Sequence, residues 1–246
     1  MIQGSLPTSI TKLTNLIALD LSDNQLTSTI PVSISYMGQL KYLQLGGNYF
    51  TGAIPNTVSF LYNLLEFNVS SNFFTGDIFM LDRYDAVGIT YIFRDMHHLE
   101  VIDMSYNGFS GYITQYNIEN TVPKYLKKLH LNDNSFVGDI TTSFGKLTSL
   151  EVLSLGGNRL VSSLPTQLSN LKNLQHLMLS RNQLTGTLPV FIGDFADLVT
   201  LDLSNNQFEG TLPSELGPSL QELRLNDNQF SGSIPQSYSQ LTSIRK

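Results

Sequence analysis

The chain contains no cysteine, and only 14% of its 246 residues are charged. Without cysteine it has no disulfide or thiol chemistry, which fits a reducing compartment. The formal net charge of −6 argues against nucleic acid as the main partner, because phosphate binding needs a basic face. There is no run of eighteen apolar residues, so we expect no transmembrane segment in this chain.

What the sequence has instead is a repeat. In the stretch "LIALDLSDNQLTSTIP" at 16–31, apolar and polar residues alternate briefly, and the alternation ends at an asparagine. This pattern is typical of neither a helix nor an ordinary strand. The unit recurs at asparagine spacings of 24, 24, 35, 27, 24, 24, 24 and 22 residues. The nine asparagines are Asn24, Asn48, Asn72, Asn107, Asn134, Asn158, Asn182, Asn206 and Asn228. Nine copies indicate a solenoid, in which each repeat contacts only its neighbours.

Each position of the unit has its own expected role. Leu16, Leu19 and Leu21 would point into a coil of parallel strands stacked about 4.8 Å apart. The asparagine amide would bond backbone groups that the following turn leaves unpaired. Two residues later comes leucine or phenylalanine, which predicts a stacked apolar spine. Four residues after the asparagine comes glycine in seven repeats, with Ser28 and Ser162 in the other two, which predicts a bend or a close backbone approach.

The unit "LxxLxLxxNxLxGxIPxxIxxLxx" resembles the plant-type leucine-rich repeat. It is similar to the ectodomains of plant receptor-like kinases and receptor-like proteins, and to polygalacturonase-inhibiting proteins. The resemblance covers essentially the whole chain and implies an α/β solenoid: a right-handed coil with a parallel β-sheet on the concave face and short 3-10 or irregular segments on the convex face. It implies a single domain over 1–246, with about nine full repeats plus partial repeats at both ends.

Departures from the family pattern give expectations about where the protein is located and whether the chain is a segment of a longer protein. The family's extracellular members usually have cysteine-paired caps, and this chain has none, so we expect either a segment of a longer protein or ends covered by partners. The start "MIQGSLPTSI" shows no signal peptide. Absent cysteine and a single glycosylation sequon at Asn68 favour an intracellular or organellar location, whereas the resemblance favours the cell surface.

The strand face supplies one set of candidate partner-binding residues. Aromatic rings and arginine are favoured anchors in interfaces, and large side chains in the variable columns of the strands are therefore the candidates. They are Tyr42, Tyr106, His130, His176, Met178, Arg181 and Arg224. The alternative is that they are ordinary solvated residues.

A second set comes from the third repeat, which is 35 residues long and carries an insert near 79–90. Insertions in solenoids map to loops on one face, often the functional one. The apolar candidates in or beside this insert and the next long loop are Phe79, Met80, Tyr84, Tyr91 and Tyr116. They would either dock a partner or cover the convex surface of the chain itself.

No catalytic, metal or cofactor site emerges from the sequence. Neighbouring His97 and His98 are not expected to converge on one ligand, and His130 and His176 lie two repeats apart, about 10 Å on strand spacing alone. We therefore expect no enzyme, no cofactor and no metal. The expected function is recognition of another protein or peptide, or a scaffold role, also as a subunit of a larger assembly. The alternative is the ligand-perceiving ectodomain segment of a receptor-like protein.

A remote alternative is binding to ice or to a polysaccharide surface, which needs a regular row of hydroxyl side chains. Four threonines share one position of the repeat: Thr27, Thr51, Thr75 and Thr185. Ser110, Val137, Val161, Glu209 and Ser231 occupy that position in the other repeats, so the row is interrupted.

Overall fold

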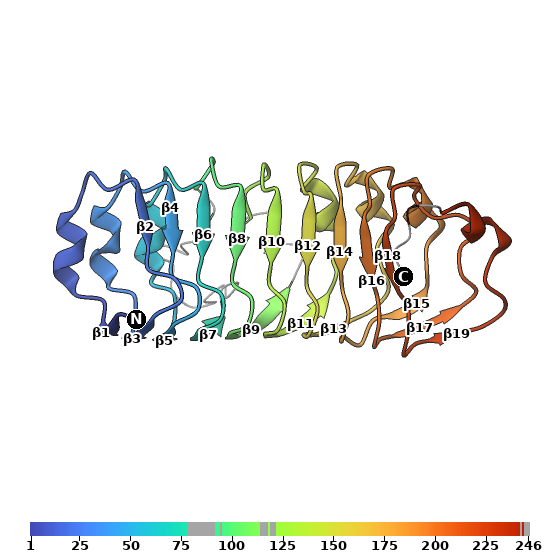
Figure 1. Ribbon diagram of the computed structural model, residues 1–246, viewed down its shortest axis with the longest axis horizontal. Helices are drawn as coiled ribbons and strands as arrows, with labels where there is room; N and C mark the ends of the chain where they lie inside the picture. The colour runs from blue at the N-terminus through green and yellow to red at the C-terminus, as the bar shows by residue number, and fades with distance from the viewer. Residues whose placement is uncertain (78–91, 94, 114–117, 119–121, 242, 244–246) are drawn as a thin grey trace, which may run out of the picture.

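Nine parallel strands form one continuous sheet, with every repeat contributing one strand (Figure 1). The structure is a computed structural model that describes residues 1–77, 92–93, 95–113, 118, 122–241 and 243. The strands of this main sheet are β2 (Ala18–Asp20), β4 (Tyr42–Gln44), β6 (Glu66–Asn68), β8 (Val101–Asp103), β10 (Lys128–His130), β12 (Val152–Ser154), β14 (His176–Met178), β16 (Thr200–Asp202) and β18 (Glu222–Arg224). Equivalent positions pair directly, even across the two long repeats, where Glu66 faces Val101 and Val101 faces Lys128. The predicted parallel sheet is confirmed.

A second set of strands, which the sequence analysis did not predict, follows the asparagine in each repeat. One sheet contains β1 (Gln3–Ser5), β3 (Gln25–Ser28), β5 (Tyr49–Gly52), β7 (Phe73–Asp77), β9 (Gly108–Ile113), β11 (Ser135–Asp139) and β13 (Arg159–Val161), and another contains β15 (Thr185–Thr187), β17 (Gln207–Gly210) and β19 (Gln229–Phe230). Here the register is staggered by two residues per repeat: Thr27 pairs with Tyr49, and Thr51 pairs with Phe73. The threonines that share a repeat position therefore do not lie directly opposite one another.

Short 3-10 helices complete seven of the described repeat units. They are η1 (Thr8–Lys12), η2 (Val32–Tyr36), η3 (Asn56–Phe60), η4 (Thr142–Lys146), η5 (Thr166–Asn170), η6 (Val190–Asp194) and η7 (Gln236–Gln240). Proline precedes six of them, with a backbone φ between −58° and −72°. Proline suits this place because its fixed φ prepares the turn and it needs no N–H partner. The predicted 3-10 segments opposite the sheet are confirmed.

The core lies inside the coil and is built from the leucine columns and a phenylalanine spine. Phe74 stacks on Phe50 at 5.9 Å between ring centroids and on Phe109 at 6.1 Å, with nearly parallel rings. Burying each such ring contributes roughly 1.5–3 kcal/mol. Where the third repeat returns to phase, Phe93 and Met96 are buried as the spacing predicts.

The asparagines form a hydrogen-bonded ladder that joins the repeats. Asn158 donates through Nδ2 to the carbonyl oxygens of Leu155 at 3.0 Å, Gly156 at 3.3 Å and Leu131 in the preceding repeat at 3.0 Å. Its Oδ1 accepts the backbone N–H of Phe136, also in the preceding repeat, at 3.0 Å. At all nine asparagines, Oδ1 accepts a hydrogen bond from a backbone N–H in this way. Each amide therefore satisfies its own turn and the neighbouring turn together.

The glycine position is a left-handed backbone turn in all nine repeats. The glycines there have φ between 77° and 113°, and Ser28 and Ser162 have φ of 75° and 76°. A non-glycine residue in this conformation costs about 1–2 kcal/mol, because Cβ crowds the following carbonyl. The positive φ explains why glycine is preferred at this position, and the two serines carry strain that glycine would not.

We predict that Asn158→Ala lowers the free energy of unfolding by about 2–4 kcal/mol, because several buried backbone groups lose their partners. Asn24 is the matched control. It occupies the same position in the first full repeat, where Nδ2 donates only within its own turn, to Leu21 and Ser22. Chemical denaturation of both alanine variants measures the difference. Equal losses would contradict the cross-repeat role of the ladder.

We predict that Ser28→Gly raises the free energy of unfolding by about 0.5–1 kcal/mol, since relief of the left-handed strain exceeds the added unfolded-state entropy. Ser35→Gly is the control, because Ser35 lies in η2 and is absent from the residues with positive φ. It should lose stability. Thermal melts of the two variants test this, and a destabilised Ser28→Gly would refute the strain.

Candidate partner-binding face

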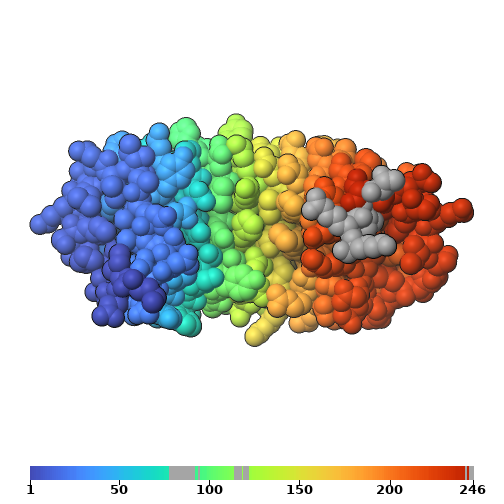
Figure 2. Space-filling model, viewed as in Figure 1, coloured from blue at the N-terminus to red at the C-terminus, as the bar shows by residue number. Residues whose placement is uncertain are grey.

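The outward face of the main sheet carries the sequence-predicted residues, but at two kinds of position. Tyr42 lies on β4, His130 on β10, His176 and Met178 on β14, and Arg224 on β18. Tyr106 and Arg181 instead occupy turns after the strands, one residue before the asparagine ladder. Figure 2 shows this side of the molecule as a continuous surface crossed by successive repeats.

Four of these residues lie on the two sides of the sixth repeat. We use the name central patch for these four residues, Asp133 and the outward residues of the sixth repeat. The middle is formed by short side chains: Val152 is 7% exposed, Ser154 is 4% exposed, and Gly156 and Gly157 follow. Longer side chains flank this middle strip on both sides. They are His130 in the fifth repeat and His176, Met178 and Arg181 in the seventh.

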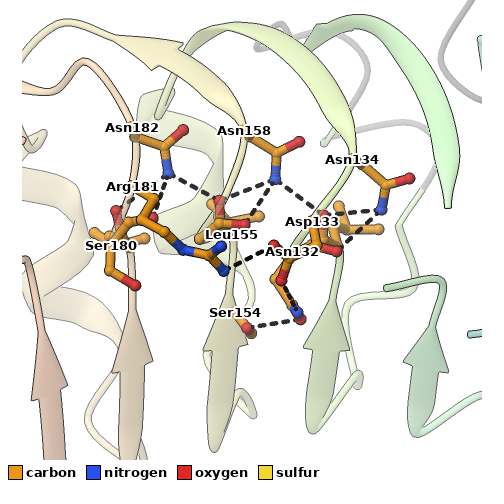
Figure 3. Close-up of polar contacts among 12 residues, drawn as sticks. Asn132, Asp133, Asn134, Ser154, Leu155, Asn158, Ser180, Arg181 and Asn182 are labelled. Carbon is orange, nitrogen blue, oxygen red and sulfur yellow. Dashed lines mark hydrogen bonds and ion pairs between the residues drawn. The ribbon is translucent and has the colours of Figure 1, made fainter. Parts of the chain in front are cut away.

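A polar network fixes the edge of the central patch (Figure 3). Arg181 Nη2 donates to Asp133 Oδ1 at 2.7 Å, and Asn132 Nδ2 donates to Asp133 Oδ2 at 2.9 Å. Ser154 Oγ in turn donates to Asn132 Oδ1 at 3.0 Å. Since Arg181 and Asp133 lie two repeats apart, these bonds span three repeats and hold the guanidinium in one place.

Glycine in the sixth repeat makes this bridge possible. A Cβ added to Gly157 would lie 2.5 Å from Asp133 Oδ1 and 3.3 Å from Arg181 Nη2. Any larger residue would therefore push the two charged groups apart. The Arg181 side chain is more than half exposed, so the ion pair itself is worth only about 0–1 kcal/mol, and its main effect is to orient the guanidinium.

Tyr106 and Arg181 are also the two bulky residues in a left-handed column. The residue before the asparagine has positive φ in all nine repeats, and it is otherwise Asp, Asn, Ser or Gly. Tyr106 has φ 53° and Arg181 has φ 54°. Bulky side chains in this conformation are strained, and such strain concentrates at functional sites. Tyr106 is 56% exposed, which leaves its ring accessible to a partner.

His130 is half-buried on β10 between Asp103 and Ser154 of the neighbouring strands. Burial lowers the pKa of the His130 imidazole, Asp103 opposes that shift, and electrostatic interactions with Lys128 and His176 lower it further. The neutral ring is therefore favoured at neutral pH, and it can both donate and accept a hydrogen bond.

The other candidates are not brought together. Tyr42 lies three strands away from β10, and Arg224 lies two strands beyond β14, 3.4 Å from Glu222 and 3.8 Å from Asp202. The insert near 79–90 lies outside the described residues. So do Phe79, Met80, Tyr84, Tyr91 and Tyr116.

Sequence reasoning missed the side chains that organise this face. Asp133 and Asn132 were not candidates, although they hold Arg181 and Ser154. It also missed an Asp/Asn-x-Ser pattern at the strand ends. In Asp20-x-Ser22, for example, the serine N–H and hydroxyl both donate to the carboxylate and lower the pKa of Asp20. The pattern recurs at Asn68, Asp103 and Asp202, so spacing alone could have revealed it.

Side chains of several chemical kinds lie on this face. Within the described ranges, no group of three His, Asp or Glu side chains could hold a metal ion. His130 and His176 are separated by β12, which puts them about 10 Å apart on strand spacing. The face carries the guanidinium of Arg181, the imidazole of His130, the thioether of Met178 and the exposed phenol of Tyr106.

Family comparison matches most of the chain to one family. Two family models described as leucine-rich repeat match residues 4–50 and 124–184, and 197–218 and 219–241, which together cover more than half of the chain. No curated protein sequence matches the chain.

Solved structures match nearly the whole chain. The plant peptide hormone receptor RGFR1, solved in complex with RGF2, is 29% identical with a TM-score of 0.80, covering 98% of this chain and 40% of its own. A TDR receptor is 30% identical with a TM-score of 0.80, covering 98% and 44%. A plant ice-binding protein is 26% identical with a TM-score of 0.79, covering 96% and 74%. The chain thus spans less than half the length of the two receptor chains.

No helix in the part of the chain that the structure describes is long and apolar enough to cross a bilayer.

We predict that Tyr106→Asn raises the free energy of unfolding by about 1 kcal/mol, because asparagine tolerates the left-handed conformation that strains tyrosine. Tyr42→Asn is the control. It replaces an exposed tyrosine within β4, where asparagine has poor strand propensity, and it should not stabilise. Urea denaturation of both variants measures this, and a lower midpoint for Tyr106→Asn would contradict the strain.

We predict that acidification destabilises the fold in part through His130. Its folded pKa lies below the ordinary 6.5, so the unfolded chain takes up the proton first and stability falls as the pH drops from 6.5 through the lower folded pKa. His130→Gln should therefore flatten the dependence of the unfolding free energy on pH in that window. Denaturant titrations at several pH values measure it. An unchanged slope would show that His130 does not contribute.

Proposed function

Since this chain belongs to the leucine-rich repeat family, we propose that it is a non-enzymatic recognition module that binds a protein or peptide across the outward face of its main sheet. The observation that carries this proposal is the central patch. There Arg181 is held in one orientation by Asp133 while most of its side chain stays exposed. A guanidinium fixed in this way loses little conformational entropy on binding, which favours affinity.

The chemistry around Arg181 supports a polypeptide as the ligand. Met178 offers a flexible, polarisable contact that adapts to apolar side chains. The neutral ring of His130 can form hydrogen bonds with amide groups. Tyr106, in the turn of the fourth repeat, offers an exposed aromatic ring as an anchor. The short middle strip of Val152 and Ser154 leaves room for a backbone to lie between the flanking side chains.

The relatives support the peptide form of this proposal. RGFR1 was solved with RGF2, and its structure superposes on nearly all of this chain. On this basis the chain is a ligand-perceiving segment of a receptor-like ectodomain at the cell surface. The wider alternative is a scaffold or an assembly subunit that holds a protein partner through the same face. The ice-binding relative supports the fold, but the staggered threonines of the second sheet do not form the row that ice binding needs.

The test is selection of peptides from a random displayed library on the whole chain, followed by affinity measurement on single-residue variants. We predict that Met178→Ser and Arg181→Gln each weaken the selected peptides by about tenfold or more, the loss expected of interface anchors. Val190→Ser is the control, because Val190 is exposed in η6 and lies outside the main sheet. It should leave binding unchanged.

Two results would contradict the proposal. One is a set of selected peptides that bind both patch variants as tightly as the parent chain. The other is selection of no peptide above the background of an unrelated protein. Thermal melts of each variant separate lost binding from lost folding, because both substitutions lie on exposed or half-buried side chains.

A further inference from the structure

A cleft of about 930 Å³ opens on the second sheet, away from the central patch. Its lining comes from β9, β11 and β13, from the segments that lead into η4 and η5, from the first residue of η4, and from Gln183 before β15. None of its lining residues belongs to the main sheet. The volume lies within the range of about 300–1,000 Å³ that small-molecule sites occupy. The cleft is therefore a separate candidate for a ligand.

Two of the lining residues, Thr141 and Ser162, depart from the repeat pattern. Thr141 stands where six repeats have proline, and Ser162 stands where seven repeats have glycine. The Oγ1 atom of Thr141 is buried and has no hydrogen-bond partner. Ser162 is held at φ 76°, a conformation that favours glycine. Both choices cost stability, and such costs concentrate where function requires them. Ser28 makes the same departure outside the cleft.

Two opposite charges also line the cleft without neutralising each other. Val137 pairs with Arg159 and Asp139 pairs with Val161, so the carboxylate and the guanidinium lie diagonally on neighbouring strands. No ion pair joins either of them to a described residue. The lining thus contains a strong acceptor and a strong donor that do not pair with each other. A ligand that carries both donors and acceptors satisfies both groups.

An aromatic ring completes the lining. Tyr112 is 67% exposed and lines the cleft, as does Val161. Aromatic rings pack well against the C–H faces of sugar rings, while carboxylate, guanidinium and amide groups bond to neighbouring hydroxyls. Gln183 supplies such an amide.

We propose that this cleft binds a unit of a neutral polysaccharide, with the sugar ring against Tyr112 and its hydroxyls bonded to Asp139 and Arg159. A neutral polyol fits better than a simple ion, because an anion meets Asp139 and a cation meets Arg159. A zwitterion such as a free amino acid is the competing ligand, since it offers one charge to each group. The excess of uncharged hydroxyl groups in the lining favours the sugar.

The test is affinity electrophoresis of the whole chain in native gels that contain laminarin, hydroxyethyl cellulose, xyloglucan, galactomannan or dextran. We expect at least one of these polysaccharides to retard the chain. Tyr112→Ala and Arg159→Gln should each weaken that retardation by about fivefold or more. Tyr42→Ala is the matched control, an exposed tyrosine on the main sheet, and it should migrate like the parent chain.

Thr141→Val is a second control. It keeps the shape of the side chain and removes a buried hydroxyl that has no hydrogen-bond partner, so we expect a higher melting temperature and unchanged retardation.

Three results would overturn the proposal: no retardation in any of the five gels, retardation that Tyr112→Ala and Arg159→Gln leave unchanged, or binding of free glycine by calorimetry without retardation by any polysaccharide. Met178→Ser, in the central patch, should leave retardation intact. Because Met178→Ser changes only the central patch, it shows whether polysaccharide binding by the cleft is independent of peptide binding by that patch.

Discussion

The fold depends on one interaction, the asparagine amide that bonds two successive turns at once. Every turn after a main-sheet strand leaves backbone carbonyl and N–H groups that water cannot reach, and nearly all such groups must be paired. Asn158 pairs three carbonyls and one N–H, of which two belong to the preceding repeat. Because the same amide serves both turns, it fixes the orientation of each repeat on the next. The strand register and the exposed face both follow from that orientation.

The shape of the outward face of the main sheet follows from this fixed orientation of the repeats. Since the main sheet is in register, side chains from equivalent positions lie in straight rows, and a single short repeat forms a dip between longer ones. The sixth repeat has Val152, Ser154 and two glycines, and the repeats on either side have the large side chains. The cleft on the second sheet is lined in part by Thr141 and Ser162, which replace the proline and glycine of other repeats. The two candidate sites thus come from substitutions within one unit, not from added structure.

Most of the fold could be predicted from the sequence, because the leucine, asparagine and glycine columns each obey one physical rule. The second sheet could not. The residues from Gln25 to Ser28 contain a single buried leucine, and their apolar and polar residues do not alternate for long enough to predict a strand. These residues form a strand because they are hydrogen-bonded to the neighbouring repeats. The candidate site was partly predictable. Arg181 stood out by its size, but its partner Asp133 lies 48 residues earlier and is reached only because Gly157 lacks a side chain.

The bridge from Arg181 to Asp133 also changes how the array comes apart. In a solenoid the free energy of unfolding is close to a sum of repeat terms and nearest-neighbour interface terms, so fraying can stop at any boundary. This bridge adds a coupling between next-nearest neighbours, the fifth and seventh repeats, across the sixth. Because the exposed pair is worth only about 0–1 kcal/mol, this coupling is weak compared with the interfaces between neighbouring repeats. It should therefore shift the populations of partly frayed states slightly towards those in which the fifth, sixth and seventh repeats are all folded.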